Sequence, residues 1–122
     1  MHDMKNRSFA ARLRFAIAGL AYAVAAERSI RTQLLAVAAV LGALLYWRPA
    51  AVWWALVLLV SAAVLAAELF NTAVERLADQ LHPQQHPQIR VVKDCAAAAV
   101  LVLSVGALCV AAALAVSLWR AR

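Results

Sequence analysis

The stretch that decides the fold is residues 95–119, which read CAAAAVLVLSVGALCVAAALAVSLW without one Asp, Glu, Lys or Arg. As an α-helix these residues would extend roughly 38 Å, which exceeds the hydrocarbon thickness of a bilayer, about 30 Å. An uncharged apolar run of this length predicts a membrane-spanning helix.

The rest of the chain has a similar composition. Hydrophobic residues make up 66% of the 122 residues and charged residues 15%, whereas soluble domains hold about 25% charged residues. We therefore expect one domain, residues 1–122, that is dissolved in lipid. The net charge of +6 comes from basic residues beside apolar runs. This placement fits anionic lipid headgroups better than nucleic acid, for which no motif is present.

Two further spans are expected before this run. The first covers about 29–48, and the second covers about 50–67 and continues as a charged cytoplasmic extension to residue 81. The segment 82–88 is a loop, because it contains two prolines among polar residues. Residues 5–27 alternate basic and apolar positions, which predicts an amphipathic helix on the membrane surface. The fold class is thus an all-α membrane protein with one surface helix and three transmembrane helices.

The charges set the expected orientation. Nine of the twelve basic residues fall on one side, which the positive-inside rule makes the cytoplasmic side, together with the amino terminus. These are Lys5, Arg7, Arg12, Arg14, Arg28, Arg31, Arg76, Arg90 and Lys93, against Arg48, Arg120 and Arg122 on the other side. The polar, basic start of the chain does not resemble a cleavable signal. Cys95 and Cys109 match no metal or redox spacing and are expected to be apolar fillers.

All six acidic residues also fall on the cytoplasmic side, which the orientation rule does not require. Four polar residues on the extension share one helix face, since they stand at i, i+3, i+7 and i+11: Glu68, Asn71, Glu75 and Asp79. Stacked carboxylates repel one another unless something positive lies nearby. The candidates are Arg28, Arg31, Arg76, Lys93 or a divalent metal, and oxygen ligands suit Mg²⁺.

Glu68 follows the apolar run directly, at the edge of the hydrocarbon. Ionisable groups within or beside a membrane span usually serve a function, and a carboxylate at this place can act as a general base. The alternative is a solvated helix extension with incidental charges. Asp94 can be a plain helix-start residue, Lys93 a snorkelling anchor and Glu27 an interfacial salt-bridge partner.

At these residues the chain closely resembles the prokaryotic diacylglycerol kinase family, which includes undecaprenol kinases. The matching segments are ELFNTAVE at 68–75, Asp79, Lys93-Asp94 with the small residues after it, and ERSIR at 27–31. The resemblance covers almost the whole chain.

This resemblance implies a homotrimer in the bacterial inner membrane that transfers the γ-phosphate of ATP to a lipid hydroxyl at the cytoplasmic interface. With diacylglycerol as acceptor the product is phosphatidic acid, a phospholipid precursor. By position, Glu68 resembles the general base, and Glu27 and Glu75 resemble the carboxylates that hold Mg²⁺ and, through it, ATP. The remaining residues implied at the site are Gln84, Gln85, His86, Lys93 and Asp94 for ATP, and Asn71, Asp79 and Arg31 as other polar groups.

Two alternatives to a diacylglycerol kinase stay open. The first is the same chemistry on undecaprenol, because the segment 27–31 and the loop 82–88 look closer to that branch, and Gln33 stands where some members carry a second acid. The second is a non-catalytic membrane protein of the same fold, against which the intact set of acidic residues argues.

Overall fold

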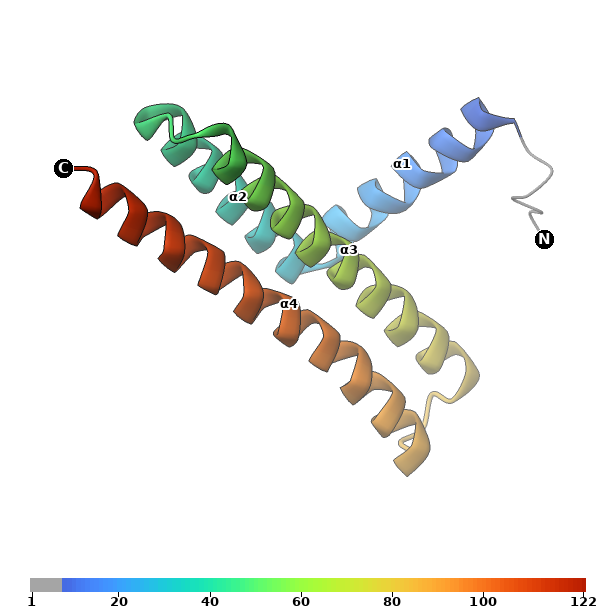
Figure 1. Ribbon diagram of the computed structural model, residues 1–122. Helices are drawn as coiled ribbons and strands as arrows, with labels where there is room; N and C mark the ends of the chain where they lie inside the picture. The colour runs from blue at the N-terminus through green and yellow to red at the C-terminus, as the bar shows by residue number, and fades with distance from the viewer. Residues whose placement is uncertain (1–7) are drawn as a thin grey trace.

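The computed structural model describes residues 8–122 as four α-helices joined by short connections (Figure 1). They are α1 (Phe9–Ala26), α2 (Arg28–Trp47), α3 (Ala51–Leu81) and α4 (Pro87–Arg120). No strand is present within residues 8–122, so the expected all-α class is confirmed. The expected start of the first helix at residue 5 and the charges of Asp3, Lys5 and Arg7 lie outside the described residues.

The helix ends follow from local chemistry. The Ser8 side chain caps α1 by accepting a hydrogen bond from the Ala11 amide at 3.3 Å. Arg48 ends α2 in the left-handed region, with φ 47°, and Pro49 follows because it cannot continue a helix. α3 is continuous through the apolar span and its charged extension. Its 31 residues extend about 46 Å, so one end must project beyond the hydrocarbon.

The fourth helix begins eight residues before the apolar run that the sequence marks at Cys95. Pro87 occupies its first turn, where a missing N–H costs nothing. The His86 ring caps this end, because its Nδ1 accepts the Gln88 amide hydrogen at 3.1 Å. The expected loop 82–88 therefore shortens to 82–86, and the start of α4 lies close to the end of α3.

Three of the helices form a bundle, in which α3 packs most extensively on α4 and less on α2 (Figure 1). The buried centre of the bundle lies at the end away from residues 82–86 and consists of Leu44, Val57 and Leu114. Trp53 and Trp54 are half-buried and pack against this cluster. The bundle is thus held by contacts among three helices, with a small core.

The outer faces of the bundle are apolar. Leu59 is 70% exposed on α3, and Val102 and Leu108 are each 69% exposed on α4. Water would make such a surface unfavourable, at roughly 25 cal/mol for each Å² of apolar area. All four helices are long and apolar enough to cross a membrane. The chain is therefore built as a multi-pass membrane protein whose outer faces are solvated by lipid.

The first helix departs from this common arrangement. α1 runs across the direction of the other three helices and projects away from them (Figure 1). That direction agrees with a helix lying on the membrane surface, although by length and composition α1 could also cross the bilayer. Its position on the membrane surface stays a prediction. The two arrangements differ in the side of the membrane on which residue 8 lies.

We predict that labelling of single cysteines will show three spans. In a background with Cys95 and Cys109 replaced by alanine, Ala121→Cys should react with a membrane-impermeant maleimide on intact cells. Gln85→Cys and Ser8→Cys should react only after permeabilisation, because both positions are expected in the cytoplasm. Reaction of Ser8→Cys on intact cells would mean that α1 crosses the bilayer. Reaction of Gln85→Cys, or protection of Ala121→Cys, would contradict the expected orientation of the whole bundle.

Candidate functional site

Polar side chains from four segments converge around the projecting half of α3. The segments are the end of α1, the first turn of α2, the α3–α4 connection and the start of α4. Hydrogen bonds and ion pairs between residues 14 to 49 positions apart tie these segments to α3. The acidic side chains of residues 8–122 thus lie at one end of the bundle.

Glu68 is the most buried charged group of this region, with 6% of its surface exposed. Its Oε2 accepts a hydrogen bond of 3.1 Å from the Ser29 hydroxyl at the start of α2. A buried carboxylate needs such a donor, because desolvation without a hydrogen bond is costly. Glu68 therefore sits where the apolar span ends, and it is held from a neighbouring helix.

One turn further along α3, Asn71 and Glu75 interact with each other. The Asn71 Nδ2 group donates to Glu75 Oε1 at 3.2 Å. The other end of this amide has no partner: Asn71 Oδ1 is the one buried, unsatisfied side-chain oxygen or nitrogen found in residues 8–122. Since buried polar atoms are almost always paired, this oxygen marks a place where a further donor or a cation is expected.

Glu27 lies between α1 and α2, where the backbone is extended rather than helical. Its carboxylate forms an ion pair of 2.7 Å with Arg76 on α3, although Arg28 and Arg31 are much nearer in sequence. The Arg76 guanidinium also lies 5.9 Å from the centre of the Tyr22 ring on α1. Arg76 thus holds the α1–α2 junction against α3. Glu75, the preceding residue of α3, lies at the same level of the helix.

The sequence does not indicate which basic residue balances the acidic row, which consists of Glu68, Glu75 and Asp79 on α3. In the structure the candidate basic residues have different partners. Lys93 pairs with Asp79 at 2.5 Å. Arg76 pairs with Glu27, and Arg31 donates to the carbonyls of Val24 and Ala25. Within residues 8–122, no ion pair reaches Glu68 or Glu75.

Five of the seven residues expected to bind ATP line a separate cleft of about 630 Å³ beside the α3–α4 connection, whereas the two expected metal carboxylates do not. Its lining includes Asp79, Gln84, Gln85, His86, Lys93 and Asp94. Glu27, Glu68 and Glu75 do not line it. Asp79 stands one turn after Glu75 on α3, so the cleft adjoins the end of the acidic row.

The donor set fits a magnesium ion that arrives with phosphates better than a closed metal cage. No three His, Cys, Asp or Glu side chains of residues 8–122 are grouped so that they could hold a metal by themselves. Mg²⁺ commonly takes only one or two carboxylates, with substrate phosphates and water completing its shell. Of the oxygen groups in this region, Asn71 Oδ1 is unpaired, the Glu75 carboxylate accepts from Asn71, and the Glu27 carboxylate is paired with Arg76.

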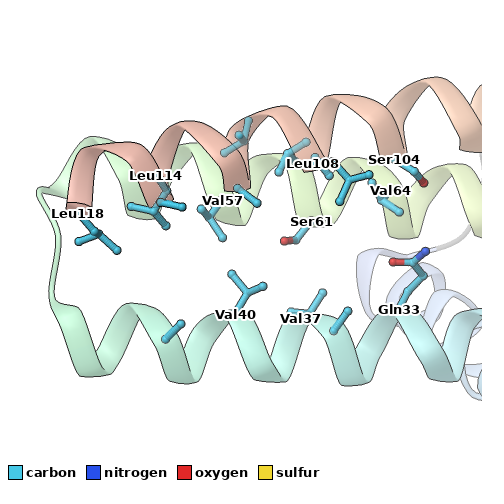
Figure 2. A pocket seen from close by; sticks show the side chains of 17 residues that line it. Gln33, Val37, Val40, Val57, Ser61, Val64, Ser104, Leu108, Leu114 and Leu118 are labelled. Atoms are coloured by element: carbon cyan, nitrogen blue, oxygen red, sulfur yellow. The ribbon is translucent and has the colours of Figure 1, made fainter. Parts of the chain in front are cut away.

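An apolar groove of about 470 Å³ leads from this region along α2, α3 and α4 (Figure 2). Gln33, Ser61 and Ser104 are the polar residues among its lining. Gln33 stands one turn after Ser29 on α2, and Val64 stands one turn before Glu68 on α3. The groove therefore begins next to the Ser29–Glu68 pair and extends to Leu118.

Sequence reasoning missed two residues of this region, Ser29 and Tyr22. Their partners lie 39 and 54 positions away, on α3. Ser29 lies within the matching segment 27–31, but neither residue belongs to a spacing pattern that indicates its partner on α3.

The described residues together form a multi-pass helical membrane protein with a cluster of acidic side chains at one end of its bundle. The family model of the prokaryotic diacylglycerol kinases matches residues 14–115. A relative from Synechocystis sp., named diacylglycerol kinase, is 36% identical over 98 residues. This match covers 80% of the chain and 56% of the length of the relative. The chain belongs to the prokaryotic diacylglycerol kinase family.

Proposed function

We propose that the protein is a membrane lipid kinase, which transfers the γ-phosphate of ATP to the hydroxyl of diacylglycerol and forms phosphatidic acid. The observation that carries this proposal is Glu68, a buried carboxylate at the end of the apolar span of α3, about three helical turns before Asp79, which lines the polar cleft. A lipid alcohol and a nucleotide can meet only at such an edge, because one dissolves in the bilayer and the other in water. Family membership supports the same reaction class.

The nucleotide side of the proposal rests on the polar cleft and the acidic row. Lys93 and the side chains of residues 84–86 can contact a nucleotide in the cleft. Glu27 and Glu75 would hold Mg²⁺, which neutralises phosphate charge when it is bound. Because phosphoryl transfer depends mainly on alignment and charge stabilisation, this site needs few reactive groups of its own.

The lipid side rests on the apolar groove beside Glu68. An acyl chain in that groove would place a glycerol hydroxyl at the polar end, near Ser29 and Gln33. Glu68 then accepts the hydroxyl proton while the hydroxyl oxygen bonds to the γ-phosphorus. The bond from that phosphorus to the β–γ bridging oxygen breaks, and ADP leaves. The proton on Glu68 is later released to solvent.

The resemblance of segments 27–31 and 82–88 to undecaprenol kinases favours undecaprenol as the second candidate acceptor. We also propose, from the family resemblance, that the active form is a homotrimer in the bacterial inner membrane with its site facing the cytoplasm. The basic residues gathered at this end of the bundle support that orientation.

The acceptor is tested with purified protein in mixed micelles that contain ATP, Mg²⁺ and one lipid alcohol at a time. We expect phosphate transfer to diacylglycerol, measured as radiolabelled phosphatidic acid. Faster transfer to undecaprenol would select the second acceptor. No transfer to either lipid would favour the non-catalytic alternative.

Replacing the proposed base should separate turnover from binding. We predict that Glu68→Gln lowers kcat by at least 100-fold, because a general base typically contributes about 10²–10⁴-fold. Calorimetric affinity for Mg-ATP should stay within a factor of two of the wild-type value. A variant that keeps most of the wild-type kcat would rule out the base.

The two proposed metal carboxylates should show the reverse pattern. We predict that Glu75→Gln and Glu27→Gln each weaken Mg-ATP binding at least tenfold in calorimetry, since each removes one charged oxygen ligand. Glu68→Gln is the matched control, because it removes the same charge from the same region without touching the metal. Unchanged nucleotide affinity in both variants would show that the metal is held elsewhere.

A further inference from the structure

The Ser29 hydroxyl has no part in the reaction as described so far. It nevertheless makes the one side-chain hydrogen bond to the proposed base, Glu68, within residues 8–122. Ser29 is an exposed residue in the first turn of α2, and Glu68 is buried on α3. The hydroxyl donates to Glu68 Oε2 at 3.1 Å, across 39 residues of sequence. A serine hydroxyl has one hydrogen to donate, and here it is directed to this carboxylate.

No other group competes for this role in the described part of the chain. Among residues 8–122, Glu68 has no second hydrogen bond and no ion pair. The terminal torsion of a glutamate, which sets the direction of its carboxylate, has no sharp preference of its own. Ser29 is therefore the contact that fixes how the Glu68 carboxylate is oriented.

The second oxygen of Glu68 is left available. Asn71 Oδ1 is the one side-chain nitrogen or oxygen of residues 8–122 that is both fully buried and unpaired. Glu68 Oε1 has no partner either, so it must keep some access to the surface. The Glu68 carboxylate thus has one oxygen held by Ser29 and one oxygen that is unpaired and partly accessible.

We propose that Ser29 is a positioning residue, which holds Oε2 of Glu68 so that Oε1 faces the lipid hydroxyl and accepts its proton. This inference rests on the proposed function, in which Glu68 is the base. It gives the first turn of α2 a role in the transfer step itself. Ser29 does not touch the nucleotide cleft, so its effect should fall on turnover and spare nucleotide affinity.

The test compares two hydroxyl deletions on the same helix. Ser29→Ala removes the donor to Glu68, whereas Thr32→Ala removes a hydroxyl that donates only to the Arg28 carbonyl within α2, at 3.1 Å. Ser29→Thr keeps the hydroxyl, and Ser29→Cys keeps the size of the side chain with a much weaker donor. Thermal unfolding in detergent reports whether each variant is folded.

We expect Ser29→Ala to lower kcat about tenfold or more, since hydrogen bonds to charged groups are stronger than neutral ones. The KM for Mg-ATP should stay within a factor of two. Ser29→Thr should restore kcat to within threefold of wild type, Ser29→Cys should not, and Thr32→Ala should behave as wild type.

Three results would overturn the inference: wild-type kcat in Ser29→Ala, an equal loss in Thr32→Ala, or a change confined to the KM for Mg-ATP. These failures are distinguishable from failure of the proposed function. If wild type phosphorylates neither lipid alcohol, both ideas fall. If wild type is active, Glu68→Gln is inactive and Ser29→Ala is normal, Ser29 alone loses its role.

Discussion

The exclusion of charge from hydrocarbon is the constraint on which the rest of this structure depends. A charged group in the centre of a bilayer costs several kcal/mol, so charges must gather where helices leave the lipid. α3 is longer than the membrane is thick, and its excess length is the segment that carries Glu68, Glu75 and Asp79. The same excess length gives α3 a water-facing half, which the end of α1 and the starts of α2 and α4 contact. The single helix α3 thus both spans the membrane and carries the acidic side chains of the site.

The site combines satisfied and unsatisfied groups in a way that a purely structural cluster would not. Asp79 and Glu27 are paired with basic side chains at the exposed or partly exposed surface, where such pairs contribute little to stability, about 0–1 kcal/mol. Glu68 is buried with a single neutral donor, and Asn71 keeps a buried oxygen without a partner. Leaving that oxygen unpaired costs about 1–3 kcal/mol. Such a cost is understandable at a place where a substrate or a cation completes the hydrogen bonding.

Much of this arrangement could be predicted from the sequence, because its strongest signals are local. The uncharged run 95–119, the helical spacing of Glu68, Asn71 and Glu75, and the prolines of 82–88 each depend on neighbours within a few turns. Predictions that required distant partners were incomplete. Spacing could not tell which cation meets which acid, and Arg76 joins Glu27 rather than the acidic row. The sequence analysis did not predict that α4 begins before the apolar run. The His86 cap and Pro87 start the helix among polar residues, which a search for hydrophobic segments leaves out of a predicted span.

The break at Glu27 shows how one residue organises the two halves of the site. Because Glu27 is extended, α1 turns away from the bundle and α2 starts afresh at Arg28. Glu27 and Ser29 are then two positions apart, at the positive end of the α2 macrodipole, which favours carboxylates close to it. Glu27 forms its ion pair with Arg76, which is next to Glu75 in the chain, and Ser29 donates to Glu68. The break at Glu27 therefore places the proposed metal carboxylate and the hydroxyl that contacts the proposed base within one helix turn.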